Sequence, residues 1–262
     1  DDEYTLFIFR LPLFNPENDV TYLTIPLGIV LFSDKIITIC WTDCEVLKDV
    51  SSNRIKNISI ENFLTFILKI MSRTDSNFLR YLKEINRRTI TIQGELQMSV
   101  KNNELIQLFN LEKSLEYFTT SLKSNQLLIE KLSKMKGIYL DEDQKDFLED
   151  IAIDNRQAIE MTDIYSNILS GMMDAFASVI SNNLNIVMKR LTVVSLVLNV
   201  PTLIVSFFGM NIQLPFANSG WIGTICVSSI CLVASFLASL ILKEKPVREK
   251  RKKKKKTKVK AI

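Results

Sequence analysis

The clearest pattern in the chain is an apolar segment, residues 191–242, that contains no Asp, Glu, Lys or Arg. It divides into two hydrophobic runs, Leu191–Phe208 and Trp221–Leu242, separated by a link at 209–220. The second run has 22 residues, or about 33 Å of helix, enough to cross a bilayer core of about 30 Å. The first run is shorter but continues a helical pattern from its N-terminal side. The sequence therefore predicts two transmembrane helices, at 191–208 and 221–242.

Charges beside these runs predict their orientation. Lys189 and Arg190 precede the first run, Lys243 and Lys245 follow the second, and the link is uncharged. The positive-inside rule then puts both chain ends in the cytoplasm and makes 209–220 an external loop. We expect a two-span protein of the inner or plasma membrane.

The last twenty residues, 243–262, form a basic cytoplasmic tail with twelve Lys or Arg against two Glu. A basic segment directly after a span is retained in the cytoplasm and contacts anionic membrane lipid. No aromatic or Gly-rich RNA-binding pattern accompanies it. The predicted partner of the tail is therefore lipid, and no nucleic acid.

The N-terminal half predicts an α+β cytoplasmic domain at 1–135 with long helices. Stretches rich in β-branched and aromatic residues indicate three strands, the last two forming a hairpin: Tyr4–Arg10, Thr21–Phe32 and Lys35–Trp41. A short helix is expected at Ile60–Ser72, and a long one from an N-cap at Asp75 to about Lys134. The chain starts without Met or a signal peptide, so we expect this domain to be N-terminally incomplete.

A further helix should begin at Asp141, which acidic residues follow in the first turn. Apolar residues then recur every three or four positions, and no stop signal occurs before Gly209. A straight helix of this length would span roughly 100 Å. We interpret 141–190 as a cytoplasmic stalk helix that continues into the first span and packs against copies of itself.

One face of the membrane-entering helix is polar. Its positions follow a 3-4 rhythm that keeps them on one side: Asn185, Met188, Thr192, Ser195, Asn199, Thr202 and Ser206. Polar groups at this depth either bond between helices or face water. Two interpretations follow, interhelical contacts in a dimer or the wall of a pore.

The stalk, by contrast, is acidic. Residues 141–174 contain ten Asp or Glu against Lys145 and Arg156. The simpler interpretation is a solvated acidic face. The alternative is that neighbouring stalks present carboxylates to each other and that hard divalent cations bridge them.

Composition narrows the function classes. The chain has no His, which excludes histidine-based catalysis and most zinc sites. It also has no phosphate loop or nucleophile motif, so we do not expect an enzyme. Four Cys fit a reducing cytosol. Cys40 and Cys44 are expected to be buried thiols, because two further metal ligands are not evident.

The sequence Phe207-Phe208-Gly209-Met210-Asn211, at the outer end of the first span, resembles the CorA family of divalent-cation channels. That family carries an aromatic residue followed by Gly-Met-Asn in this place. The resemblance extends from about Asp141 to Lys245 and includes Met188–Thr192, Pro201-Thr202 and the Lys-rich tail. It implies a homopentameric funnel with five long helices around one pore and outer second-span helices.

Residue roles are implied by the same resemblance. Gly209, Met210 and Asn211 would form the external ring that ions enter, and Met188 with Leu191 a hydrophobic gate. The pore-lining set would be Asn185, Met188, Leu191, Thr192, Ser195, Asn199, Thr202 and Ser206. The acids of an intersubunit regulatory metal site would be Asp146, Glu149, Asp150 and Asp154.

The implied function is a channel for passive influx of Mg²⁺, with Co²⁺ and Ni²⁺ as further candidate ions, gated by cytoplasmic Mg²⁺ bound between subunits. Two departures affect ion identity. Asn199 stands where the family often has a bulky apolar residue, and the link lacks the acids of many members. A Zn²⁺ transporter of the same superfamily is one alternative. A membrane-anchored coiled-coil signalling or tethering protein is a more distant one.

Overall fold

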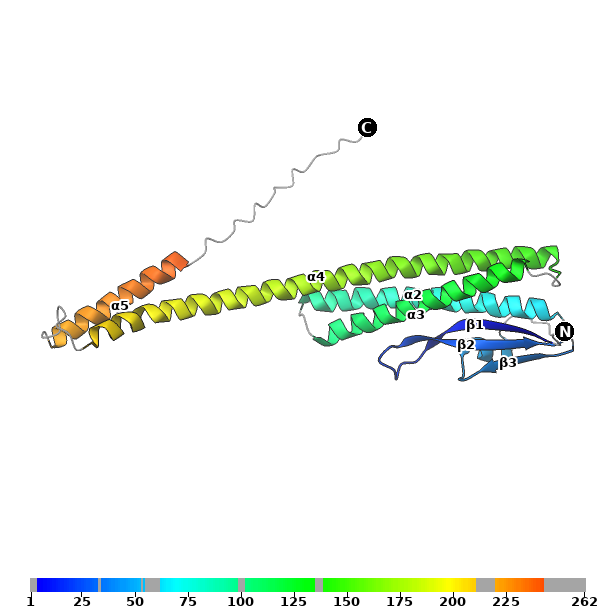
Figure 1. Ribbon diagram of the computed structural model, residues 1–262, viewed down its shortest axis with the longest axis horizontal. Helices are drawn as coiled ribbons and strands as arrows, with labels where there is room; N and C mark the ends of the chain where they lie inside the picture. The colour runs from blue at the N-terminus through cyan, green and yellow to red at the C-terminus, as the bar shows by residue number, and fades with distance from the viewer. Residues whose placement is uncertain are drawn as a thin grey trace, which may run out of the picture. The chain divides into compact units, whose positions relative to one another are not determined.

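The computed structural model describes residues 4–32, 34–52, 54, 62–98, 102–134, 139–210 and 220–242. Its elements form two compact units, Asp1–Ser178 and Val179–Ile262, and α4 contributes to both. Figure 1 labels the elements named below, except the short helix α1. In chain order they are β1 (Thr5–Phe14), β2 (Tyr22–Leu31), β3 (Ile36–Cys40), α1 (Glu45–Ser51), α2 (Phe63–Met98), α3 (Asn102–Lys134), α4 (Glu142–Phe208) and α5 (Trp221–Leu242).

The three predicted strands form one antiparallel sheet in the order β1-β2-β3. β1 continues past Arg10, its predicted end, and includes Pro12, because β1 is an edge strand and an edge tolerates a missing N–H. Pro26 lies in the central strand, but β3 reaches only as far as the Leu27–Cys40 pair. Neither proline therefore removes a hydrogen bond that the sheet needs.

Helix α3 holds the free edge of β1. The Asn125 side chain donates to the Arg10 carbonyl at 2.9 Å and accepts from the Arg10 N–H at 2.9 Å. Ser121 adds a hydroxyl contact to Thr24 of β2 at 2.8 Å. Hydrogen bonds thus join α3 to the edge strand β1 and to Thr24 of β2. Apolar side chains from β1, β2 and α2 form a core against the sheet, including Phe9, Leu27 and Ile67.

Helices α2 and α3 correct the sequence-based prediction of a single helix from Asp75 to about Lys134. α2 begins much earlier, at Phe63, so the short helix at Ile60–Ser72 is part of it. The two helices pack side by side: Phe78 of α2 meets Phe118 of α3 edge-on, with ring centroids 5.0 Å apart. Residues 99–101, between them, lie outside the described part.

Asp75 is not an N-cap. That role belongs to Asn62, whose side chain accepts from the Thr65 N–H at 3.1 Å. Asp75 lies inside α2 and is only 2% exposed. Its partner is Asn155 of α4, whose amide donates to Asp75 Oδ1 at 3.1 Å.

The predicted start of α4 is confirmed, and its mechanism is a capping box. The Asp141 carboxylate accepts from the Gln144 N–H at 2.7 Å, and Gln144 Oε1 accepts from the Asp141 N–H at 3.2 Å. The Gln144 amide also donates to Asn62 and Thr65, which ties the start of α4 to the start of α2. Along the first unit, α4 buries one stripe at helical spacing, listed as Gln144, Leu148, Ile151, Asn155, Ala158, Thr162, Leu169 and Phe176.

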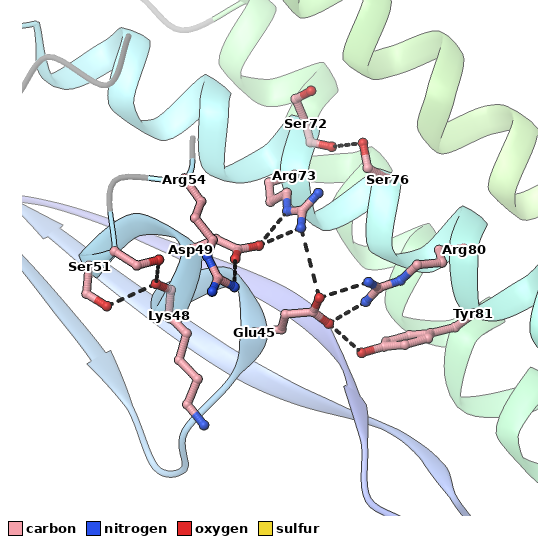
Figure 2. A network of polar contacts seen from close by, with 11 residues as sticks. Glu45, Lys48, Asp49, Ser51, Arg54, Ser72, Arg73, Ser76, Arg80 and Tyr81 are labelled. Atoms are coloured by element: carbon pink, nitrogen blue, oxygen red, sulfur yellow. Dashed lines mark hydrogen bonds and ion pairs between the residues drawn. The ribbon is translucent and has the colours of Figure 1, made fainter. Parts of the chain in front are cut away.

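A short helix, α1, was not predicted from the sequence. Figure 2 shows the polar network that fixes it to α2. Asp49, 3% exposed, accepts from Arg73 at 2.8 and 2.5 Å, and Glu45 accepts from Arg80 and Tyr81. The hydrogen bonds from Arg80 lower the pKa of Glu45. Burial, with the bond to Glu45, raises the pKa of Tyr81 to about 12.

The second unit contains the end of α4 and all of α5. α5 has the bounds predicted for the second span, Trp221–Leu242. Both helices are long and apolar enough to cross a membrane, and their apolar windows are almost entirely unburied within the chain. Gly220, at φ +52°, precedes α5 in the left-handed conformation that glycine tolerates.

The α1 network generates a stability prediction. Arg73→Ala should lower the free energy of unfolding by about 2 kcal/mol, because it leaves the buried Asp49 carboxylate without its close partner. Chemical denaturation of the full chain in detergent, followed by circular dichroism, measures the change.

Arg54→Ala is the matched control. Its side chain is 76% exposed and 3.7 Å from Asp49, so its loss should change stability by less than about 1 kcal/mol. Equal effects of the two substitutions would contradict this account.

Candidate functional site

The polar stripe on α4 is open to the surroundings. We use this term for Asn185, Met188, Thr192, Ser195, Asn199, Thr202 and Ser206. All seven are exposed, and all lie in the second unit. At about 100° per residue they fall on one side of the helix. The sequence-predicted residues are therefore gathered on one face, and the described residues of the same chain leave that face uncovered.

The opposite side of α4 carries a second stripe, which is half-buried: Val193, Val197, Val200, Pro201, Ile204 and Phe208. On α5 the least exposed residues are mostly small and also share one face: Gly223, Cys226, Val227, Cys231, Ala234, Ser235 and Ala238. Small residues let two helix backbones approach closely in a membrane. We infer that these two stripes face each other, which turns the polar stripe away from α5.

Threonine hydroxyls on the polar stripe have a defined orientation. Thr192 Oγ1 donates to the Met188 carbonyl and Thr202 Oγ1 donates to the Leu198 carbonyl, both at 2.9 Å. Because each proton is used within the helix, the oxygen presents its lone pairs outward. The stripe therefore offers hydrogen-bond acceptors to any group that lies against it.

The outer end of the stripe lines an open groove of about 610 Å³. Asn199, Thr202, Ser206 and Met210 contribute to it, with Leu203 and Phe207 on its apolar side. α4 ends here, and the Gly209 N–H donates to the Val205 carbonyl at 2.9 Å. A Cβ atom at Gly209 would lie 3.4 Å from that carbonyl oxygen, which is an ordinary van der Waals contact. Asn211, the third member of the expected external ring, lies outside the described residues.

At the inner end, Met188 and Leu191 expose large apolar side chains, 53% and 59% respectively. They lie one turn apart on neighbouring parts of the helix surface. These are the two residues expected to form a hydrophobic gate.

The acids of the stalk lie in the first unit, on the side of α4 away from its buried stripe. Asp146, Glu149 and Asp150 are exposed, whereas Asp154 is half-buried at the flank of the packed face. In the described part of one chain, no three His, Cys, Asp or Glu side chains come close enough to hold a metal ion.

Comparison with known proteins decides the family. Residues 1–244 match the model of the family described as CorA-like Mg²⁺ transporter protein. The chain belongs to this family. It is 30% identical over 225 residues to the cobalt/magnesium transport protein CorA of Methanocaldococcus jannaschii, covering 84% of this chain and 69% of that protein. It is 21% identical to the magnesium transport protein CorA of Helicobacter pylori, covering 88% and 73%.

Solved structures agree. The complete structure of the CorA magnesium transporter from Methanocaldococcus jannaschii matches with a TM-score of 0.76 and 26% identity, over 92% of this chain and 76% of that one. The full-length CmaX protein matches with a TM-score of 0.69 and 14% identity, over 92% and 75%, which supports the fold alone. The resemblance inferred from Gly-Met-Asn and its flanks is confirmed at the level of the family.

Sequence reasoning missed the stripe of small, less exposed residues on α5 of this CorA-family chain. Its signal was present in the spacing of Gly223, Cys231 and Ala234, but the uniform hydrophobicity of the span concealed it. Cys226 and Cys231, both free thiols, lie on this stripe of α5. Cys44 is buried and Cys40 half-buried, and burial raises the pKa of the Cys44 thiol.

The two stripes on α4 predict opposite reactivities. In a background without native cysteines, Thr202→Cys should react with a membrane-impermeant thiol reagent, because Thr202 is exposed within the chain and a pore wall would keep it in contact with water. Val197→Cys, five residues away on the half-buried stripe, is the matched control and should react at least tenfold more slowly. Labelling rates in intact membranes measure the difference. Faster labelling at position 197 would show that the helix is rotated from the orientation inferred here.

Proposed function

We propose that this chain forms a channel through which divalent cations, Mg²⁺ above all, pass down their electrochemical gradient into the cytoplasm. The observation that carries the proposal is the polar stripe, exposed on α4 and directed away from the α5-facing stripe. Several copies of α4 with this stripe turned inward would enclose a hydrated path. Five copies in a homopentamer is the assembly that the family resemblance implies.

The chemistry of the stripe suits a hydrated cation. Mg²⁺ gives up its water reluctantly, so a path that accepts hydrogen bonds from that water is easier to enter than one that must replace it. Thr192 and Thr202 present acceptor oxygens, because their hydroxyl groups already donate hydrogen bonds to helix carbonyls. The absence of charge from 191–242 would keep the ion from binding too tightly to leave.

The direction of flux follows from the membrane potential. Moving one charge across 100 mV changes the free energy by about 2.3 kcal/mol, so a divalent ion gains about 4.6 kcal/mol on entry into a negative cytoplasm. Influx through such a path needs no further energy source. The basic residues beside both spans support the orientation with both termini in the cytoplasm.

Met188 and Leu191 are proposed as the gate. Rings of exposed apolar side chains at the inner end of a pore can close it by excluding water. Gly209, Met210 and Asn211 are proposed as the outer ring, where amide and backbone oxygens would meet the hydrated ion.

Regulation is assigned to Asp146, Glu149 and Asp150. These exposed carboxylates are hard oxygen donors on one face of the stalk, and they form half of a site that a neighbouring subunit would complete. Bound Mg²⁺ would neutralise the facing acids and favour the closed state, because a ligand stabilises the state that binds it better. The half-buried Asp154 is left out of this site, since it lies at the flank packed against the rest of the unit.

The names of relatives bear on ion identity. The relative from Methanocaldococcus jannaschii is named for both cobalt and magnesium, which supports Co²⁺ as a second ion. A Zn²⁺ transporter remains the nearest alternative. The cytoplasmic domain of ZntB from Vibrio parahaemolyticus shares the fold at 13% identity, but Zn²⁺ prefers nitrogen and sulfur ligands and this chain has no His.

Uptake into proteoliposomes tests the proposal. The wild-type chain should take up Mg²⁺, and Asn211→Ala should reduce the initial rate at least tenfold while leaving assembly unchanged. Asn218→Ala, in the same link, is the matched control and should retain most of the rate. A coiled-coil tether would show no uptake with any of the three proteins.

The regulatory assignment has its own test. Asp150→Asn removes a carboxylate that Mg²⁺ would bridge, so several-fold more internal Mg²⁺ should be needed to close the channel. The measurement is the internal Mg²⁺ concentration that halves the uptake of external Mg²⁺. Asp163→Asn removes another exposed acid of α4 and should leave that concentration unchanged. If both substitutions act equally, general acidity rather than a site controls the gate.

A further inference from the structure

A buried carboxyl joins α2 to α4. Asp75 of α2 is 2% exposed and Asn155 of α4 is 1% exposed, and they lie 80 residues apart in the sequence. The Asn155 amide donates to Asp75 Oδ1 at 3.1 Å. The contact links the helix that carries the polar stripe to the α2–α3 pair in the first unit.

The amide of Asn155 is only half satisfied. Its Oδ1 atom is buried and has no hydrogen-bond partner among the described residues. An ionised Asp75 could not supply one, because a carboxylate only accepts hydrogen bonds. A neutral Asp75 could donate its O–H to Asn155 Oδ1 while it accepts from Asn155 Nδ2. The acid and the amide would then form a reciprocal pair that leaves neither group unsatisfied.

The surroundings favour the neutral acid. Burial raises the pKa of Asp75 from 3.8 to about 7, the Asn155 amide opposes this, and the charge of Asp154 on α4 adds to it. Asp154 is the one charged group in the described parts of α2, α3 and α4 that acts on it. The nearby cation of α2, Arg73, is instead paired with Asp49 and Glu45.

We propose that Asp75 and Asn155 form a proton-operated latch that holds α4 against α2. With the proton present, two hydrogen bonds join the helices. When Asp75 loses its proton to water, one hydrogen bond and a buried charge remain, so α4 is held less firmly and the channel opens more readily. The effect of this pair on transport rests on the proposed function, whereas the existence of the pair does not.

The sign of the pH effect follows from linkage. The folded protein holds the Asp75 proton up to about pH 7, whereas the unfolded chain releases it near pH 3.8. The stability that the pair contributes is therefore fully present at low pH and is lost as the pH rises through about 7. The chain has no histidine, so few other side chains titrate between pH 6 and 8.

The first test is thermal denaturation of the full-length protein in nanodiscs at pH 6 and pH 8. The wild-type Tm should be lower at pH 8 than at pH 6. Asp75→Asn should fold and show a Tm that changes much less, because an amide keeps both hydrogen bonds at either pH. Asp163→Asn, which removes an exposed carboxylate of α4, should behave like the wild type. Equal pH dependence in wild type and Asp75→Asn, or failure of Asp75→Asn to fold, would overturn the latch.

The second test is Mg²⁺ uptake with the proteoliposome interior, the cytoplasmic side, at pH 6.5 or pH 8. The internal Mg²⁺ needed to halve uptake should rise several-fold at pH 8 in the wild type and stay constant in Asp75→Asn. An equal shift in both proteins, or no shift in either, would overturn the coupling to transport. Absence of uptake from every protein would refute the proposed function instead, and the Tm comparison would then decide on the pair alone.

Discussion

A polar group inside a hydrocarbon layer must be hydrated or hydrogen-bonded, and this constraint governs the end of α4. The helix enters the apolar segment with Thr, Ser and Asn on one side and Val, Ile and Phe on the other. We infer that small residues of α5 cover the apolar side, and the described part of a single chain leaves the polar side exposed. Water or hydrogen bonds from other copies of the helix can satisfy it. The proposed assembly and the proposed ion path both rest on this requirement.

The first unit positions this helix by polar contacts at its start and along its length. The capping box of Asp141 and Gln144 begins α4 and also bonds the N-cap of α2. The reciprocal bonds between Asn125 and Arg10 fix α3 on the edge of the sheet. Such contacts specify where each element lies, because a displaced partner would leave a buried polar group unsatisfied. Apolar packing alone would be less selective.

Patterns that depend on neighbouring residues were predictable from the sequence. The strands, the start of α4 at Asp141 and the bounds of α5 all follow from local spacing and capping chemistry. The break between α2 and α3 was missed because residues 95–105 contain no glycine or proline. Asp75 was interpreted as an N-cap because aspartate favours that position, whereas Asn155, 80 residues away, decides its role. α1 depends in the same way on Arg73 and Arg80.

The candidate ion pathway could be predicted as a set of residues but not as an arrangement. The 3-4 spacing fixes which side chains share a face of α4, and the structure agrees that this face is exposed. What lies opposite that face depends on other copies of the chain, which neither the spacing nor one chain contains. The same holds for Asp146, Glu149 and Asp150.

Electron cryomicroscopy of the full-length protein in lipid nanodiscs with Mg²⁺ tests the central claim most directly. We predict a ring of subunits whose Asn199 and Thr202 side chains surround a continuous axial path with ordered water or ions. An assembly in which these side chains face lipid, with no axial path between the α4 helices, would contradict it.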